Sequence, residues 1–499
     1  MLSRYRFNKN LFLRVAILAL TMTAMGGLQA QPLSSGYWQT RGNAIVDSTG
    51  EPVRIAGISW FGAETTQFAP FGLNVRGYKD LLDQILQLGY NSIRFPYSNQ
   101  LFDSASVPVG INSTLNPDLQ GLSGLQVLDA IVNYAGRIGL RIILDRHRPD
   151  ANAQSALWYT AAYPESRWIS DWLMLVTRYA NNPVVVGVDL HNEPADPACW
   201  GCGTPTLDWS LAAERAGNAI LAVNPNLLIV VEGIQTYDGD SYWKGGNLRG
   251  VAQFPLTLAI PNQLVYSAHE YPASVYPQPW LLGASFPGNL PAIWDTHWGY
   301  IRTNNIAPVL LGEFGVKLAT AADSQWFDAI TQYLGTDVSG PSWLFWTLNP
   351  NSSDTGGLLL DDWTTVDARK QAKLAPLQNP LVLAPNAVTP SIPVCQVSYQ
   401  VTLDWGTGFT ATVSIVNNTG APLNGWTVMW SFPGNQTMQN VWDSTMLINS
   451  SAGVIVQNLQ FNAAIANGAA LYFGFAANYT GTNPIPLNFE MDGFTCATK

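Results

Sequence analysis

Two glutamates lie where apolar, strand-like segments of this sequence end. Glu193 closely follows the run V-V-V-G-V-D-L at 184–190, and Glu313 follows A-P-V-L-L-G at 307–312. A carboxylate at the end of a buried strand costs desolvation free energy unless it is used. Two such groups facing one cleft could act as a general acid/base and a nucleophile, the pair that cleaves glycosidic bonds. We therefore treat this pair as the candidate catalytic centre.

Eight short apolar runs, separated by helix-like segments, are expected to position these glutamates. The runs cover 54–62, 91–98, 141–147, 184–194, 227–233, 264–271, 307–315 and 342–350. Amphipathic stretches such as 78–88 and 210–223 lie between them, with Leu81, Leu82 and Ile85 at helical spacing. Eight strand–helix repeats predict an α/β fold, a (β/α)₈ TIM barrel over 31–375. A doubly wound open sheet is the alternative, but no G-x-G-x-x-G follows the first strand.

Other side chains that could take part in chemistry stand at the ends of these predicted strands. In a TIM barrel, functional groups gather at the C-terminal ends of the strands. Besides the two glutamates, those ends carry Trp60, Arg94, His147, Asn192, His269, Tyr271 and Trp346. Glu232 ends the fifth run, and we assign it no role. Each of these residues could be structural on its own, but their joint placement favours a site.

The types of these residues suggest a division of roles. The acid of a glycosidase pair needs a raised pKa, and the nucleophile needs donors that keep it ionised. Arg94 is the expected partner of Glu313, and Tyr271 could donate a second hydrogen bond to it. Asn192 could hold a sugar hydroxyl group. His147 and His269 would line the subsite, and Trp346 would stack under the sugar ring.

The composition argues against a nucleic-acid partner. The chain has 499 residues, a net charge of -10, only 12% charged residues and 19 tryptophans. A nucleic-acid-binding protein usually carries a basic surface. A weakly charged, aromatic-rich chain instead suits an extracellular protein that binds neutral, hydroxyl-rich ligands.

The first thirty residues have the pattern of a secretory signal peptide. Arg4, Arg6 and Lys9 precede an apolar stretch at 11–25, and small residues lead to a predicted cleavage after Ala30. An uncleaved membrane anchor is the alternative, but Arg14 interrupts the apolar run. We therefore expect a secreted, extracellular protein that has no membrane association after cleavage of 1–30.

Four cysteines fit an oxidising destination. Cys395 and Cys496 bracket the last hundred residues and predict a disulfide that closes a C-terminal module. Cys199 and Cys202 form C-W-G-C, for which we expect a local structural disulfide. A redox-active pair is the alternative, but the thioredoxin-like context of such a motif is missing.

The sequence pattern changes after residue 375. Pro376, Pro380, Pro385 and further prolines predict a stiff linker over 376–394. From 395 to 499, alternating apolar and polar residues with frequent turn signals predict an all-β sandwich. The expected organisation is thus a signal peptide, a barrel, a linker and a β module.

The strand-end motifs resemble glycoside hydrolase family 5. The resemblance rests on the motifs I-R-F-P-Y-S, I-L-D-R-H, D-L-H-N-E-P, Y-S-A-H-E-Y, L-G-E-F-G and F-W-T-L-N-P. Within that family, the sequence is especially similar to the bacterial endo-β-1,4-glucanases, with which it shares D-R-H-R-P-D, P-A-C-W-G-C-G and D-T-G-G. It implies Glu193 as acid/base and Glu313 as nucleophile, with the other strand-end residues around the −1 sugar. It also implies that no metal or cofactor is needed. The expected partners are cellulose and soluble β-glucans, and we expect a monomer.

The C-terminal module resembles the family 2 cellulose-binding modules. The similarity lies in the flanking cysteines, in W-G-T-G-F at 405–409 and in N-G-W-T-V at 424–428. It implies that exposed Trp405 and Trp442 stack on a flat glucan surface. Phe461 stands where those modules normally carry a third tryptophan, which implies weaker binding to crystalline cellulose. Trp426 is expected in the core.

Three alternatives within the same family remain open at this stage. A β-mannanase, a xyloglucanase or a mixed-linkage glucanase would share the same catalytic residues. A non-catalytic carbohydrate-binding adhesin is a fourth possibility from a different class. Such an adhesin should have lost one of the carboxylates or part of the surrounding Arg–Asn–His set, and all of these are present.

Overall fold

The computed structural model describes residues 36–180, 182–378, 395–418, 422–450, 453–486, 489–491 and 494–498. The predicted signal peptide (1–30) and the linker residues 379–394 lie outside the described residues. Within the described part of the chain, no helix is long and apolar enough to cross a membrane.

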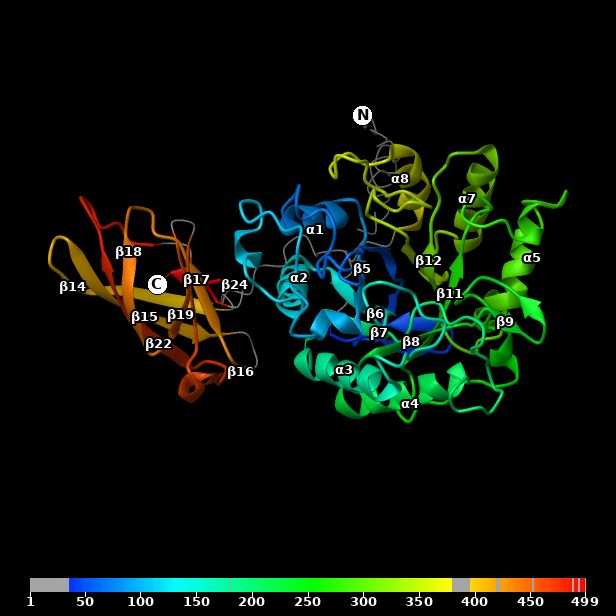
Figure 1. Cartoon of the computed structure of the whole chain (residues 1–499), viewed down its shortest axis with the longest axis horizontal. Helices are drawn as coiled ribbons and strands as arrows, with labels where there is room; N and C mark the ends of the chain where they lie inside the picture. The colour runs from blue at the N-terminus through cyan, green and yellow to red at the C-terminus, as the bar shows by residue number, and fades with distance from the viewer. Residues whose placement is uncertain are drawn as a thin grey trace, which may run out of the picture.

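Eight parallel strands close into a barrel, which confirms the predicted TIM-barrel class (Figure 1). In chain order they are β4 (Ala56–Ser59), β5 (Ser92–Ser98), β6 (Arg141–Arg148), β7 (Val185–Asp189), β8 (Leu228–Glu232), β11 (Leu264–Glu270), β12 (Val309–Phe314) and β13 (Ser342–Phe345). Seven of the eight predicted runs contain one of these strands, and the run 141–147 covers all of β6 but its last residue. Consecutive strands pair along the sheet, and β13 pairs with β4 to close it.

Helices between the strands cover the outside of the barrel. The longer ones are α1 (Tyr78–Gln87), α2 (Gly124–Ile138), α3 (Glu165–Arg178), α4 (Trp209–Val223), α7 (Ala321–Leu334) and α8 (Ala368–Leu374), and the shorter α5 (Leu290–Trp294) and α6 (Tyr300–Thr303) flank a π-helical segment, η5 (Asp295–Gly299). Local sequence sets their ends. Ser123 and Gln126 form a capping box at the start of α2, and Gly139, with φ +90°, ends it.

An N-terminal sheet and apolar side chains fill one end of the barrel. Strands β1 (Gln39–Arg41), β2 (Ala44–Val46) and β3 (Pro52–Val53) pair antiparallel. Trp38 and Ile45 from this segment belong to one buried cluster with residues of six barrel strands, such as Ile143, Val230 and Leu310. Because this part of the barrel is apolar, polar side chains can collect only toward the C-terminal ends of the strands.

The C-terminal module is an all-β structure, as predicted. One sheet has the order β18 (Thr437–Trp442), β22 (Ala470–Asn478), β15 (Gly408–Asn417), β14 (Cys395–Asp404) and β25 (Ala497–Thr498). The other has the order β19 (Thr445–Ser450), β20 (Gly453–Gln457), β17 (Thr427–Trp430), β23 (Glu490–Met491) and β24 (Phe494–Thr495), and a short pair joins β16 (Leu423–Asn424) to β21 (Ala464–Ile465). Trp426, Trp430 and Phe475 are buried in its core, as expected for Trp426.

Both predicted disulfides are present. Cys395–Cys496 joins two positions 101 residues apart, and Cys199–Cys202 closes the C-W-G-C segment. A loop of about 100 residues implies a stabilisation of roughly 4.7 kcal/mol on the chain-entropy model. The first bridge therefore ties the start of the module to its end.

Candidate active site

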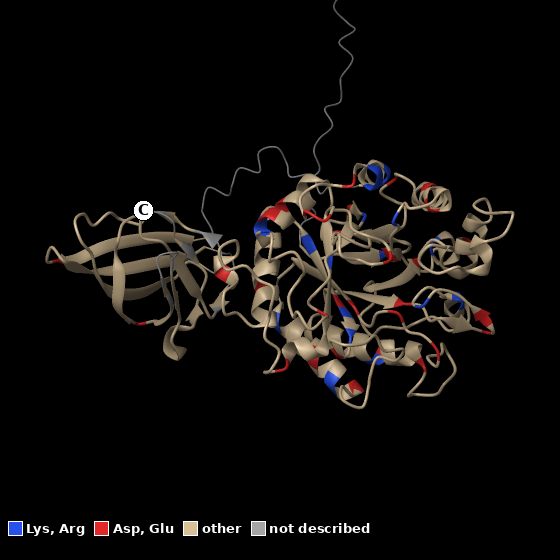
Figure 2. Cartoon of the chain, turned by 45° about the horizontal axis from the view of Figure 1, so that its top comes forward, with Lys and Arg blue, Asp and Glu red and all other residues tan. Residues whose placement is uncertain are grey.

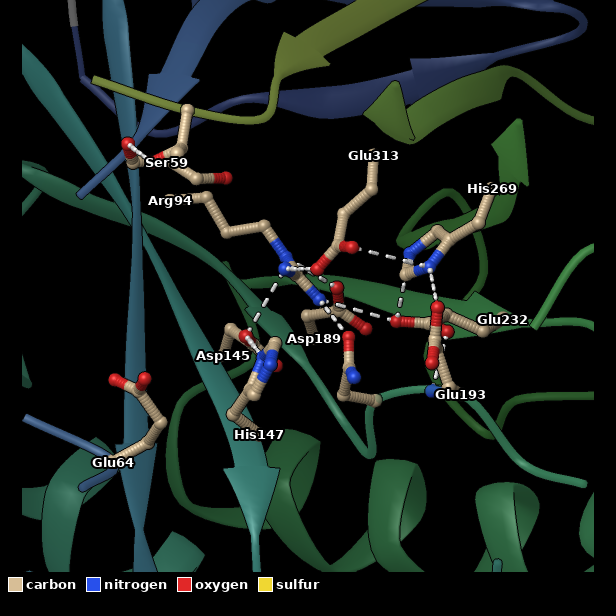
Figure 3. A network of polar contacts seen from close by, with 12 residues as sticks. Ser59, Glu64, Arg94, Asp145, His147, Asp189, Glu193, Glu232, His269 and Glu313 are labelled. Carbon is tan, nitrogen blue, oxygen red and sulfur yellow. Dashed lines mark hydrogen bonds and ion pairs between the residues drawn. The ribbon is translucent and has the colours of Figure 1, made fainter. Parts of the chain in front are cut away.

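Arg94 lies at the centre of a buried polar network at the C-terminal ends of the barrel strands (Figure 3). Its guanidinium donates to Asp189 Oδ2 (3.0 Å), to Asn192 Oδ1 (2.9 Å) and to Glu313 Oε1, and it also contacts Asp145 Oδ2 (3.1 Å) and Glu232 Oε1 (3.2 Å). The side chain is completely buried. A buried guanidinium needs such acceptors, since an unpaired buried charge is costly. The network explains why polar groups from five barrel strands, or from the loops after them, lie together inside the barrel.

Glu313 is held as a carboxylate. It follows the apolar part of β12, and its second oxygen accepts a hydrogen bond from Tyr271 Oη (2.7 Å). Burial alone would raise the pKa of Glu313, but His269 and Arg94, together with the Tyr271 bond, lower it below the ordinary value. An ionised carboxylate with fixed donors is what a nucleophile requires.

Removal of the Tyr271 hydroxyl group should move the acidic limb of the pH profile. The Tyr271→Phe variant loses a hydrogen bond that favours the ionised form of Glu313. The pKa of Glu313 should therefore rise, and the acidic limb of kcat/KM should shift to higher pH. Profiles of both enzymes on one soluble substrate test this, with the exposed Tyr276→Phe as a control. An unchanged acidic limb would show that Tyr271 does not stabilise the ionised form.

Glu193 faces Glu313 with a different environment. Its carboxylate Oε1 lies 3.2 Å from His269 Nδ1, and its side chain is 24% exposed. One carboxylate oxygen of Glu193 and one of Glu313 lie within 4.8 Å of each other. Carboxyl groups about 5–5.5 Å apart are typical of retaining glycosidases, whereas inverting enzymes need a wider gap.

His269 lies between the two glutamates. Its Nδ1 atom is 3.2 Å from Glu193 Oε1 and 3.6 Å from Glu313 Oε2, while Nε2 is 3.2 Å from Glu232 Oε1. Burial lowers the pKa of His269, but the surrounding carboxylates outweigh it and raise the pKa well above the usual value. A cationic imidazole at this place offsets part of the negative charge of the cluster.

A stack of three rings forms one wall of the site. The His147 ring lies parallel to Trp346, with centroids 5.4 Å apart, and Trp346 stacks on Phe61 at 5.3 Å. His147 Nδ1 lies 2.6 Å from Asp145 Oδ2, and burial lowers the pKa of this histidine well below its ordinary value. A neutral imidazole beside a half-buried indole is suited to an uncharged ligand.

The structure corrects the prediction for Trp60. Its side chain is 0% exposed, belongs to the main core and donates from Nε1 to the Phe71 carbonyl (2.9 Å). It cannot contact a substrate in this position. The next residue, Phe61, takes part in the site instead, because neighbouring side chains on an extended chain point in opposite directions. Asn349 fixes Phe61 through both of its backbone polar groups.

Three buried carboxyl groups of this network had no role assigned from the sequence. Asp145 and Asp189 lie on β6 and β7, and Glu232 ends β8. Their signal was present, since all three are acidic residues at or near the ends of predicted strands. What the sequence could not show is that Arg94 contacts every one of them.

Among the residues that the structure describes, two groups of side chains are close enough to hold a metal ion. They are Asp145, His147 and Glu313, and Glu193, His269 and Glu313. Glu313 belongs to both groups, and its oxygens already accept hydrogen bonds from Arg94 and Tyr271. The residue that both groups share is thus already engaged within the protein, and a role as a carboxylate nucleophile explains its contacts.

The outer face of one sheet in the C-terminal module carries exposed aromatic rings. Trp442 covers Gly474, and Trp405 covers Gly408, where a side chain at either glycine would collide with the indole ring. Alternate residues of β22 face the core, so Tyr472 lies on the same outer face, about 7 Å along the strand from Gly474. Tyr472 is exposed, and the sequence analysis did not identify it.

Phe461 lies close to this row of rings. It is 74% exposed in the short helix η7 (Gln460–Asn462), and Asn462 donates to the carbonyl of Asp443, the residue after Trp442. Figure 2 shows few charged residues on this module. An uncharged face with several exposed rings fits a neutral, flat ligand.

The comparisons with known proteins agree with this fold and site. The family model of cellulases, glycosyl hydrolase family 5, matches residues 46–352, and that of a cellulose-binding domain matches 395–496. A paired-carboxylate site in a TIM barrel is typical of glycoside hydrolases. The chain belongs to glycosyl hydrolase family 5, the cellulase family, and carries a C-terminal cellulose-binding domain.

Relatives support both parts of the chain. An endoglucanase of Paenibacillus polymyxa is 51% identical over 382 residues, which cover 75% of this chain and 96% of that protein. The major extracellular endoglucanase of Xanthomonas campestris is 36% identical over 497 residues, covering 94% of this chain and 99% of the relative. The solved catalytic domain of the latter enzyme superposes with a TM-score of 0.66 at 39% identity, over 68% of this chain and 99% of that domain.

Proposed function

We propose that this chain is a secreted endo-β-1,4-glucanase that hydrolyses internal bonds of cellulose by double displacement. The observation that carries the proposal is the pair of carboxylate oxygens, within 4.8 Å of each other, in contrasting surroundings. Relatives named endoglucanase, similar over most of their length, support the substrate class.

The contacts of the two glutamates suggest the order of steps. Glu313, ionised and held by Arg94 and Tyr271, attacks the anomeric carbon while Glu193 protonates the leaving oxygen. The glycosidic C–O bond breaks as the bond to Glu313 forms. A water molecule, deprotonated by Glu193, then displaces Glu313 and gives a product with the original anomeric configuration.

The remaining residues of the site are proposed to bind the sugar. Asn192, whose oxygen is fixed by Arg94, can present its amide group to the 2-hydroxyl of the sugar. His147 lines the pocket, and Trp346 stacks beneath the ring. His269, whose side chain is completely buried, would act on the sugar through the two glutamates that it contacts. We propose the same domain limits as predicted: a signal peptide at 1–30, a barrel to 375, a linker to 394 and the binding module. We further propose a monomer without membrane association.

A substrate panel tests the proposed specificity. The enzyme should hydrolyse carboxymethylcellulose faster than β-mannan, xyloglucan or mixed-linkage glucan, and long cello-oligosaccharides should be cut at internal bonds. A clear preference for mannan would overturn the cellulase assignment.

An NMR time course of the released anomer should show the β form first, whereas an initial α product would exclude double displacement.

Deletion of the module should separate binding from catalysis. A chain ending at residue 394 should keep its activity on soluble substrate but adsorb less to solid cellulose.

In the full chain, Trp442→Ala should weaken adsorption to solid cellulose about tenfold, because one stacking ring is lost. Leu447→Ala, which removes an exposed apolar side chain from the other sheet, is the matched control. Equal adsorption without the module would contradict its proposed role.

A further inference from the structure

We propose that Glu232 is a positioning residue that holds the acid/base Glu193 in its reactive orientation. The inference rests on the proposed function of Glu193 and Glu313. Glu232 ends β8 and is completely buried. Its role would therefore be exerted through the residues it contacts.

Three contacts connect Glu232 to the reacting groups (Figure 3). Its Oε2 atom accepts a hydrogen bond from the backbone N–H of Glu193 at 2.7 Å. Its Oε1 atom accepts from Arg94 Nη2 at 3.2 Å and lies 3.2 Å from His269 Nε2. One carboxyl group thus contacts the acid/base itself, the arginine that binds the nucleophile and the histidine between them.

The backbone at Glu193 needs such support. Its φ angle is +54°, in the left-handed region that residues with side chains rarely adopt. Pro194 follows, and a residue before proline is further restricted. Such a conformation persists only when surrounding contacts hold it. The N–H of Glu193 donates its hydrogen bond to the carboxyl group of Glu232. This bond holds the backbone of Glu193, and therefore the position of its Cα atom, from which the catalytic side chain extends.

Gly245 provides the space for this contact. A Cβ atom on Gly245 would lie 2.3 Å from Glu232 Oε2 and 3.3 Å from Glu193 Cα. The Gly245 carbonyl accepts from Gly233 N–H, and its own N–H donates to the Pro194 carbonyl at 3.4 Å. The glycine thus lies against both residues, and its lack of a side chain lets the carboxyl group reach the Glu193 amide.

A carboxylate fits this position better than an amide. The Glu193 N–H donates to Oε2 and Arg94 Nη2 donates to Oε1, so both oxygens of Glu232 serve as acceptors, and the cationic His269 lies 3.2 Å from Oε1 through Nε2. Burial raises the pKa of this carboxyl group to about 8, because the opposing effects of His269 and Arg94 are smaller. The contact geometry, in which a donor meets each oxygen, is what favours the carboxylate. A glutamine has one acceptor oxygen, and its NH₂ group would face a donor. Glu232→Gln should therefore release either Glu193 or the Arg94–His269 pair.

The test compares two substrates that differ in their need for an acid. Cellohexaose requires protonation of its leaving oxygen, whereas 2,4-dinitrophenyl β-cellobioside does not, because dinitrophenolate is a good leaving group. Glu232→Gln should lower kcat/KM on cellohexaose about 100-fold and on the aryl glycoside less than about fivefold. Equal losses on both substrates, or no loss on either, would overturn the proposal.

Asp189→Asn is the comparison variant. It removes the negative charge of a partner of Arg94 (3.0 Å) without touching the Glu193 amide, so any loss of rate should be similar on both substrates. A selective loss in this variant as well would assign the effect to Arg94 and overturn the role of Glu232.

A second variant covers the case in which Glu232→Gln does not fold. Gly245→Ala should displace the carboxyl group from Glu193 while leaving Glu232 chemically unchanged, and it should show the same selective loss. Full activity of Gly245→Ala on cellohexaose would overturn the proposal. If instead the wild-type enzyme fails on cellohexaose, or Glu313→Gln still turns it over, the proposed function itself fails. That result is distinct from equal losses on the two substrates in Glu232→Gln, which would overturn the role of Glu232 alone.

Discussion

Glu313→Gln is expected to lose hydrolysis by at least about 10⁴-fold, on soluble and solid substrates alike. The amide cannot attack the anomeric carbon, and it removes the negative charge that Arg94 and His269 surround. Initial rates on carboxymethylcellulose and on 2,4-dinitrophenyl β-cellobioside measure the loss. A good leaving group should not restore activity, because the attacking atom itself is missing.

Binding should survive in this variant. Trp405, Trp442 and Phe461 lie in the separate β module, so adsorption of Glu313→Gln to solid cellulose should match that of wild type. The exposed Glu51→Gln is the matched control for the loss of a carboxylate and should keep full activity. Retained turnover by Glu313→Gln, after removal of wild-type contamination, would exclude Glu313 as the nucleophile.

Glu193→Ala is expected to lose activity according to the leaving group. With cello-oligosaccharides, loss of the general acid should reduce kcat/KM about 10²- to 10⁴-fold. With 2,4-dinitrophenyl β-cellobioside, formation of the glycosyl-enzyme should remain fast, and its hydrolysis should become slow because the general base is also missing. Stopped-flow measurements should then show a burst of dinitrophenolate.

Azide provides a direct check on the same variant. A small anion can attack the glycosyl-enzyme without a general base, so azide should accelerate turnover and yield the β-glycosyl azide. The wild-type enzyme is the control, and azide should not accelerate it. Formation of the α azide, or equal losses of Glu193→Ala on both substrates, would contradict the role of Glu193 as acid/base.

Much of the fold could be predicted from local patterns. The eight apolar runs each coincide with one barrel strand to within a few residues, and the amphipathic stretch at 78–88 contains α1. Hydrophobic periodicity reports which face of a segment is buried, and that is a local property. The closing disulfide of the module was also predictable, because its cysteines bracket a segment of regular β pattern.

The site was predictable as a set of strand ends but not as a set of contacts. Glu193 and Glu313 are 120 residues apart along the chain. They nevertheless lie close together, because the C-terminal ends of all parallel strands in a barrel lie on the same side of it. The direction of each side chain was less certain. Trp60 points into the core and Phe61 joins Trp346, a difference of one residue at the end of a strand.

The sequence by itself determined the class of fold, the two glutamates and most of their neighbours, since strand order and strand ends follow from local patterns. Only the tertiary structure decided that Arg94 contacts four carboxyl groups and that Glu232 reaches the amide of Glu193 beside Gly245. These contacts join β5 to β6, β7, β8 and β12, and they depend on strand register and on the space left by neighbouring side chains. Such features exist only once the barrel has closed.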